Sequence, residues 1–238
     1  MKTLALDNVG YRVGEHWLVR DCSFTVAPGE LTVLVGPNGA GKSTILKLLS
    51  GLWTPTEGGV SIDGVDLFEL DRPQIARQIS IVLQDTRLDH GFTVEEVVAM
   101  GRLPHLSRFG KLTDHDHELI ENALRRTDVA GLRHRSVNTL SGGEKQRVML
   151  ARSLATEAEC ILLDEPTASL DGESAEALIG LCVDELDGGR ALVLVAHDAG
   201  LWRETLGDRL ASVALEVLEA ESEEEGQGRE APRVEEKP

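Results

Sequence analysis

Residues 36–43 have the residue types and the spacing of a P-loop, a loop that holds phosphate groups. The segment fits the pattern GxxxxGK[ST] and consists of Gly36-Pro37-Asn38-Gly39-Ala40-Gly41-Lys42-Ser43. Its glycines let backbone N–H groups point at phosphate oxygens, and a following helix adds a positive dipole end. In such a loop Lys42 reaches the β- and γ-phosphates, and the Ser43 hydroxyl is a ligand of Mg²⁺. We assign the next residue, Thr44, to the same nucleotide-binding set.

Two carboxylates, Asp164 and Glu165, follow a short apolar run. The run covers residues 160–163 and is typical of a buried strand that ends at an active site. Beside a P-loop, Asp164 is expected to complete the Mg²⁺ site, and Glu165 to polarise a water for attack on the γ-phosphate. Strands that end in acids are common, so this assignment depends on the loop motif that precedes it.

A third segment suited to phosphate binding is Leu140-Ser141-Gly142-Gly143-Glu144-Lys145-Gln146-Arg147. Two glycines after a serine expose backbone N–H groups at the start of a helix. The alternative is an ordinary serine N-cap followed by a flexible turn. The specificity of the whole eight-residue string favours a nucleotide contact through Ser141, Gly142 and Gly143.

Taken in order, these motifs resemble the nucleotide-binding subunit of ATP-binding cassette (ABC) transporters. Residues 36–43 resemble the family's Walker A loop, residues 140–147 its signature sequence and residues 160–165 its Walker B strand. Four single positions also match family motifs: the Q-loop glutamine at Gln84, the D-loop aspartate at Asp171, the switch histidine at His197, and the adenine-stacking aromatic at Tyr11. The resemblance extends over about residues 9–200.

The resemblance implies an ATPase that uses ATP and Mg²⁺. It implies catalytic roles for Lys42, Gln84, Glu165 and His197, and metal ligands at Ser43, Gln84 and Asp164. Two subunits would pair head to tail as an ATP-driven homodimer, with each ATP between one P-loop and the other subunit's signature segment. The implied partners are membrane permease subunits and a solute-binding protein.

Two segments bear on the kind of transporter. They are Val94-Glu95-Glu96-Val97-Val98 and Met100-Gly101-Arg102-Leu103-Pro104-His105, and they resemble importers of metal chelates: ferric siderophores, haem and cobalamin. The alternative is helix and turn material shared by many ABC subunits. An ABC exporter subunit and a soluble ABC ATPase of iron–sulfur cluster assembly are alternative functions. A DNA-maintenance ABC ATPase is disfavoured, because such proteins need long coiled coils between the two halves of the cassette.

The motifs need elements that bring them to one edge of a sheet. Apolar runs predict strands at 31–35, 79–83, 160–163 and 191–196, and periodic segments predict helices at 43–49, 93–100, 114–127, 142–156 and 173–186. This alternation predicts an α/β fold with a mostly parallel sheet covered on both faces. Alternating residues in the first 30 positions and at 58–70 predict a small antiparallel sheet.

The resemblance makes this fold more specific. It implies a P-loop NTPase with a RecA-like parallel-sheet core, an antiparallel β subdomain and a helical subdomain inserted at about residues 88–152. We expect the ATPase domain to cover residues 1–220. After residue 206 the sequence departs from the family, because the expected hairpin with its glycines is missing or degenerate.

Charge and composition narrow the function further. The chain of 238 residues has 41 acidic and 24 basic residues, a formal net charge of −17, which disfavours nucleic acid as a partner. The longest apolar run, 191–196, is far shorter than the ~20 residues of a membrane-spanning helix, and Asp7 interrupts any signal-peptide core. We therefore expect a cytoplasmic protein, peripheral on the inner face of the cell membrane. Residues 221–238 form an acidic, low-complexity tail that we expect to be disordered.

Other candidate sites are weaker. His115 and His117 lie two residues apart, so on a helix their side chains point in different directions and cannot share a metal. The three cysteines are far apart and are expected in the core as reduced thiols. The three tryptophans, at positions 17, 53 and 202, are too scattered in the sequence to predict a cofactor site.

Overall fold

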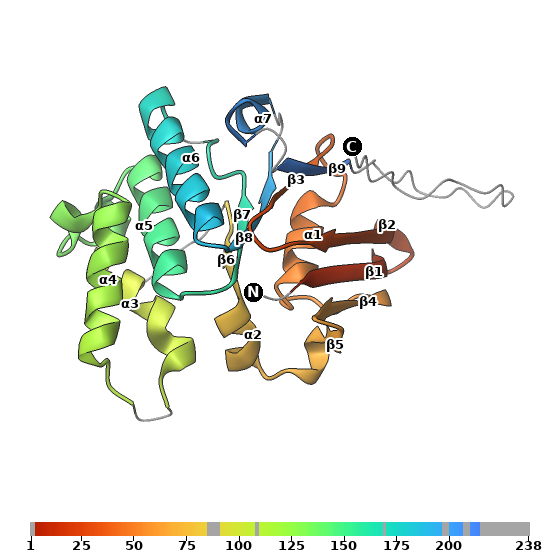
Figure 1. Ribbon diagram of the computed structural model, residues 1–238, viewed down its shortest axis with the longest axis horizontal. Helices are drawn as coiled ribbons and strands as arrows, with labels where there is room; N and C mark the ends of the chain where they lie inside the picture. The colour runs from red at the N-terminus through yellow and green to blue at the C-terminus, as the bar shows by residue number, and fades with distance from the viewer. Residues whose placement is uncertain are drawn as a thin grey trace, which may run out of the picture.

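Five parallel strands form the larger of two sheets in the computed structural model, which describes residues 3–84, 91–107, 110–168, 170–196, 200–206 and 210–214 (Figure 1). The strand order is β6-β7-β8-β3-β9. The strands are β3 (Leu31–Val35), β6 (Ile79–Val82), β7 (Cys160–Asp164), β8 (Ala191–Val195) and β9 (Leu210–Ala214). Because all five run in one direction, the carboxyl ends of β3, β6 and β7 lie along one edge of the sheet.

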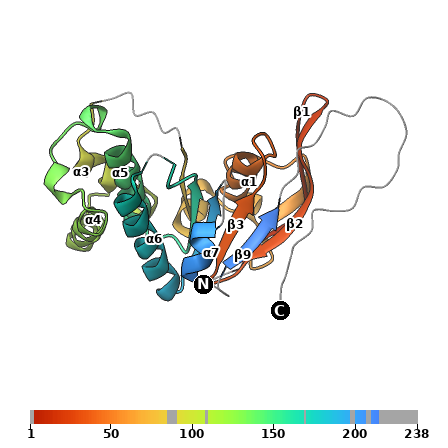
Figure 2. The same cartoon turned by 90° about the horizontal axis from the view of Figure 1, so that it is seen from above.

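This sheet is buried on both faces, which explains why its strands are nearly continuous apolar runs. In β7, Ile161 and Leu163 pack toward α5 and α6, whereas Cys160 and Leu162 pack toward α1. The figures show the helices on the two sides of the sheet (Figures 1 and 2). The helices that cover the sheet include α1 (Lys42–Leu49), α2 (Arg72–Gln78), α5 (Gly142–Ala155), α6 (Gly172–Asp187) and α7 (Gly200–Leu206).

The smaller sheet is antiparallel, with strand order β2-β1-β4-β5. Its strands are β1 (Leu4–Val13), β2 (His16–Val26), β4 (Glu57–Ile62) and β5 (Val65–Asp66), followed by the 3₁₀ turn η1 (Leu67–Glu69). Helix α1 packs between the two sheets, and its buried residues share one core with β1, β2 and β4 (Figure 1). The α1 helix therefore fixes the antiparallel sheet beside the P-loop.

Helices make up the chain between β6 and β7 in its described parts. They are α3 (Val94–Ala99), η2 (Met100–His105), α4 (Asp114–Arg126), η3 (Ala130–Leu132), η4 (Val137–Thr139) and α5. Capping boxes start α3, α4 and α5, where Thr93, Thr113 and Ser141 each accept a hydrogen bond from the backbone N–H three residues later. We call the residues from α3 to α5 the helical part.

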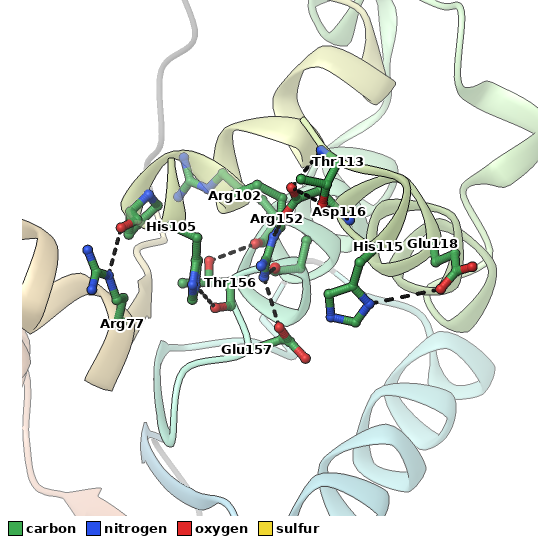
Figure 3. Close-up of polar contacts among 12 residues, drawn as sticks. Arg77, Arg102, His105, Thr113, His115, Asp116, Glu118, Arg152, Thr156 and Glu157 are labelled. Atoms are coloured by element: carbon green, nitrogen blue, oxygen red, sulfur yellow. Dashed lines mark hydrogen bonds and ion pairs between the residues drawn. The ribbon is translucent and has the colours of Figure 1, made fainter. Parts of the chain in front are cut away.

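A buried arginine holds the helical part together (Figure 3). Arg102 donates to Asp116 Oδ1 at 2.8 Å, to the Ala155 carbonyl at 2.7 Å and to Glu157 Oε2 at 3.1 Å. Its side chain is only 4% exposed, so these acceptors replace water around the guanidinium. The hydrogen bonds from Thr113 N–H, the Thr113 hydroxyl and Arg102 hold the pKa of Asp116 well below its usual range. The network joins η2, α4 and the end of α5.

The predicted fold class is confirmed, and most predicted elements lie within one or two residues of the observed ones. Several details differ. Helices α2 and α7 were not predicted. Strand β9 was not predicted either, although it extends the parallel sheet beside β3. Only residues 57–62 and 65–66 of the second antiparallel segment are strands, because η1 follows at residue 67.

Candidate functional site

The P-loop connects the end of β3 to the start of α1, as its motif predicts. Gly39 and Gly41 both have φ of +84°, a left-handed conformation that glycine adopts without strain. A Cβ on Gly41 would lie 2.4 Å from the carbonyl oxygen of Leu18 in β2. Position 41 therefore needs glycine both for its backbone angle and for the close approach of the neighbouring strand.

Lys42 is buried within this loop, with 6% of its surface exposed. Its ammonium donates to the carbonyl oxygens of Gly36 at 2.7 Å and Pro37 at 2.9 Å. The loop thus supplies two neutral acceptors for a buried cation. An anion placed in the loop offers a stronger, charge-assisted partner for the same N–H groups.

A cavity of about 520 Å³ lies against the P-loop. Apart from Leu18, its lining consists of predicted site residues: Asn38, Gly39, Gly41, Lys42, Ser43, Thr44, Gln84 and Glu165. Three separate stretches of sequence therefore meet at the carboxyl edge of the parallel sheet. Leu18 was missed by the sequence analysis, because nothing in the alternation of β2 distinguishes it from other strand residues.

Asp164 and Ser43 come from β7 and α1 and are in contact. The Ser43 hydroxyl donates to Asp164 Oδ1 at 3.2 Å. Burial raises the pKa of Asp164, and the neighbouring Glu165 charge raises it further, against the hydrogen bond from Ser43. Both side chains present the hard oxygen donors that Mg²⁺ prefers, and a cation there would stabilise the buried carboxylate. The residues therefore fit a magnesium ion.

Glu165 follows β7 in an unusual backbone conformation. Its φ is +49°, which costs a residue with a side chain about 1–2 kcal/mol. Its backbone N–H donates to the Val195 carbonyl of β8 at 3.2 Å. Its Oε2 accepts a hydrogen bond of 3.0 Å from the side-chain amide of Gln84, at the end of the neighbouring strand. The predicted general base and the predicted Q-loop glutamine are therefore direct partners.

The signature segment begins α5 at Ser141. The Ser141 hydroxyl accepts from the Glu144 N–H at 3.2 Å, and Glu144 Oε2 accepts from the Ser141 N–H at 2.7 Å. The serine N-cap that we considered as the alternative is therefore present in this structure. Among the described residues that line the P-loop cavity, none belongs to residues 140–147. Within one chain, then, the structure does not bring Ser141, Gly142 and Gly143 to the P-loop cavity.

The remaining predicted positions are placed as follows. Asp171 caps α6, where its carboxylate accepts from the Ser174 N–H at 2.8 Å, and this hydrogen bond lowers its pKa. Ala40 is buried in the P-loop. His197 lies outside the described residues. The histidine assignment therefore stays a prediction.

Tyr11 has a neighbour that the sequence did not predict. Its ring stacks on Trp53 with centroids 4.9 Å apart and an angle of 18° between the planes. The ammonium of Lys47, in α1, lies over the Trp53 ring, 4.4 Å from its centroid. We had set Trp53 aside because the tryptophans are scattered in the sequence, but the fold places it against the predicted base-stacking residue.

The histidines and cysteines that the sequence offers as weaker candidates belong to no metal-binding cluster in the part of the chain that the structure describes. Within the described ranges, no group of three or more His, Cys, Asp or Glu side chains could hold a metal ion. All three cysteines are free and buried, and burial raises the pKa of each thiol to about 12. None of the described helices is both long and apolar enough to cross a membrane.

The comparisons with known proteins agree on one family. The sequence profile of the ABC transporter family matches residues 19–168. The cobalamin import ATP-binding protein BtuD of Halobacterium salinarum is 45% identical over 200 residues, which are 84% of this chain and 50% of that protein. The iron(3+)-hydroxamate import protein FhuC of Bacillus subtilis is 38% identical over 83% of this chain and 74% of its own length. The hemin import protein HmuV of Nocardia farcinica is 47% identical over 75% of this chain and 61% of its own.

A solved structure agrees with this relationship. The dimeric structure of a bacterial ABC transporter cassette superposes with a TM-score of 0.78 and 28% identity, over 95% of this chain and 99% of that one. The lengths differ among the sequence relatives, and this chain spans about half the length of the cobalamin import protein.

Proposed function

The chain belongs to the ABC transporter family, and we propose that it binds and hydrolyses ATP to drive a solute through a separate membrane permease. The observation that carries this proposal is the cavity shared by the P-loop, Gln84 and Glu165. Transfer of a phosphoryl group to water needs positioned charges more than covalent chemistry. The cavity brings together the buried Lys42, the backbone amides of the P-loop and the Glu165 carboxylate. These groups supply such charges.

ATP would bind with its phosphates in the P-loop. Lys42 would exchange the carbonyls of Gly36 and Pro37 for the β- and γ-phosphate oxygens, a gain because hydrogen bonds between charged groups are stronger. The backbone N–H groups of the loop and the start of α1 would surround the phosphates. The adenine would stack on Tyr11, next to the same helix.

Three side chains would hold Mg²⁺, namely Ser43, Asp164 and Gln84. The first two are already in contact at 3.2 Å, and Gln84 lines the same cavity. The ion would supply positive charge to the phosphate oxygens.

Glu165 would act on the attacking water. As the water oxygen bonds to the γ-phosphorus, the bond to the ADP oxygen breaks, and the carboxylate accepts the proton that the water loses. Lys42 and His197 would stabilise the charge on the γ-phosphate. Gln84, which donates a hydrogen bond to Glu165 at 3.0 Å, would sense the γ-phosphate and transmit its presence toward the permease.

A second copy of the chain would complete the site. Ser141 caps a helix that begins at Gly142 and Gly143, but these residues do not line the cavity of their own chain. A head-to-tail homodimer would place them, with Asp171, against the ATP bound to the partner. Nucleotide would then act as the contact between the two subunits.

The proposed partners are permease subunits and a solute-binding protein, with the ATPase peripheral on the cytoplasmic face of the membrane. Relatives named for import of cobalamin, iron(3+)-hydroxamate and hemin support a metal chelate as the solute. We propose that residues 1–220 form the ATPase domain, with the helical subdomain at about 88–152, and that residues 221–238 lie outside it.

Substitution of Glu165 by Gln tests this function. The amide keeps the size of the side chain but cannot take a proton, so hydrolysis should fall about 10²-fold or more while MgATP still binds. Phosphate release and equilibrium binding of MgATP measure the two quantities. The control is Glu176→Gln, an exposed acid on α6 whose loss should leave the rate unchanged. Wild-type turnover by Glu165→Gln would remove this residue from the mechanism.

The same variant tests the composite site. Because hydrolysis is blocked, MgATP should hold Glu165→Gln as a dimer in size-exclusion chromatography. Adding Ser141→Arg should restore the monomer, since the larger side chain occupies the space of the γ-phosphate. A variant that binds MgATP and stays monomeric would contradict the head-to-tail arrangement.

A further inference from the structure

We propose that Trp53 is a positioning residue for the nucleobase, which holds the Tyr11 ring in place before nucleotide arrives. The inference rests on the proposed function, because it needs a nucleotide in the P-loop. Its observation is the stack of Tyr11 on Trp53, with centroids 4.9 Å apart and planes 18° from parallel.

The Tyr11 side chain lies on the side of its sheet that faces the P-loop. Tyr11 in β1 pairs with Val19 in β2, and cross-strand partners point to the same face of a sheet. A Val19 methyl would lie 2.7 Å from a Cβ on Gly41. The face that carries Tyr11 is thus the face that touches the P-loop.

Backbone hydrogen bonds fix the segment that carries Trp53 at both ends. The Trp53 N–H donates to the Lys47 carbonyl of α1 at 3.1 Å. Three residues later, the Thr56 N–H donates to the Gly10 carbonyl at 2.8 Å, and the Thr56 hydroxyl accepts from the Arg12 N–H at 3.2 Å. Trp53 is therefore tied to α1 on one side and to the residues flanking Tyr11 on the other.

The Trp53 ring itself is also held. The Lys47 ammonium lies 4.4 Å from the ring centroid, a cation–π contact. Trp53 and Tyr11 are both half-buried and pack against the core shared by α1 and the antiparallel sheet. Because α1 begins at Lys42, one helix carries the phosphate-binding lysine at its start and, through Lys47 and Trp53, supports the Tyr11 ring from its end.

This support has a thermodynamic consequence for the base. A ring already fixed against a second aromatic loses little freedom when a base stacks on it, so preorganisation strengthens binding. The interaction free energy of two aromatic rings corresponds to about a three- to tenfold change in binding affinity. We expect the support from Trp53 to strengthen binding of the base and not of the phosphates, because Trp53 is not among the described residues that line the phosphate cavity.

The test compares ligands with and without a base. We would measure, by calorimetry on the full chain, the affinity for MgADP and for magnesium tripolyphosphate, which has phosphate groups but no base. Trp53→Leu should weaken MgADP about three- to tenfold and leave tripolyphosphate within twofold. Trp53→Phe, which keeps a ring, should restore most of the MgADP affinity.

Trp17 provides a matched control. It pairs with Arg12, which a register shift in β1 separates from Tyr11. Its ring contacts the guanidinium groups of Arg12 and Arg20. Trp17→Leu should therefore change neither affinity.

A double substitution separates support of Tyr11 from other roles. Tyr11→Ala should weaken MgADP by at least as much as Trp53→Leu, and adding Trp53→Leu to it should cost no more than a further twofold. Full additivity would overturn the inference, as would equal losses for MgADP and tripolyphosphate in Trp53→Leu. If the wild-type protein bound neither ligand, the proposed function itself would fail, and this inference with it.

Fluorescence gives a readout that needs no truncation of the core. MgADP should change the tryptophan emission of the wild-type protein, and tripolyphosphate should not. The change should disappear in Trp53→Phe and persist in Trp17→Phe. A change that survived in Trp53→Phe would come from another tryptophan and would contradict the inference.

Discussion

Lys42 is the residue on which nucleotide binding should depend most. We expect Lys42→Ala to weaken ATP binding at least about tenfold, because each hydrogen bond to a charged group contributes about 1.5–3 kcal/mol. Calorimetric titration with MgATP measures the loss. Lys111→Ala is the control, since it removes an exposed lysine far from the P-loop in sequence and should leave affinity unchanged. Equal affinities for all three proteins would exclude Lys42 from the phosphate site.

The sequence predicted most cavity-lining residues but few of their contacts. The spacing of a P-loop motif predicts its backbone conformation, so the sequence alone could predict that Lys42 and Ser43 line the cavity. The bond from Gln84 to Glu165 joins residues 81 positions apart, and it follows only from the pairing of β6 with β7. The contact between Tyr11 and Trp53 depends in the same way on how α1 packs against β1, and no local sequence pattern predicts that packing.

Among the elements, α4 should show a measurable dependence on pH through Asp116. Its pKa is lower in the folded protein than in the unfolded chain, so its stabilising effect is present above the unfolded pKa of about 4 and is lost as pH falls below it. Asp116→Asn should lower the free energy of unfolding by about 3 kcal/mol at pH 7, because Arg102 loses a buried partner. The difference from wild type should persist to about pH 5 and shrink below pH 4.

Urea unfolding at several pH values measures this difference. The control is Glu118→Gln on the same helix, whose side chain is 80% exposed, and its effect should stay within about 0.5 kcal/mol. A difference for Asp116→Asn that did not change between pH 7 and pH 3 would contradict the depressed pKa.

Elements with local signals were mostly predictable, although α2 was not predicted despite its capping box of Asp71 and Gln74. The start of α4 was predicted at Asp114, where Thr113 and Asp116 form a capping box of residues three positions apart. Strand β9 has the sequence Leu210-Ala211-Ser212-Val213-Ala214, which lacks the β-branched run of the other strands. It becomes a strand through pairing with β3, a partner about 180 residues earlier in the chain.

At the scale of the whole molecule, the acidic tail should be dispensable for nucleotide binding. Removal of residues 221–238 should leave the affinity for MgATP unchanged, because the predicted site residues and the cavity lining all precede it. Calorimetry on the shortened and full chains tests this. A loss of more than about tenfold, or 1.4 kcal/mol, would show that the tail belongs to the site or to the fold.

The burial of all three thiols makes the native protein nearly inert to maleimide reagents, which attack an accessible thiolate. Cys22, Cys160 and Cys182 can therefore stay in place during site-directed labelling. Cysteines introduced at Glu118 on α4 and at Val13 at the end of β1 would take up a pair of fluorophores selectively, since both positions are exposed. Energy transfer between the two dyes would then follow the helical part and the antiparallel sheet as nucleotide binds, in a chain altered only at the two labelled positions.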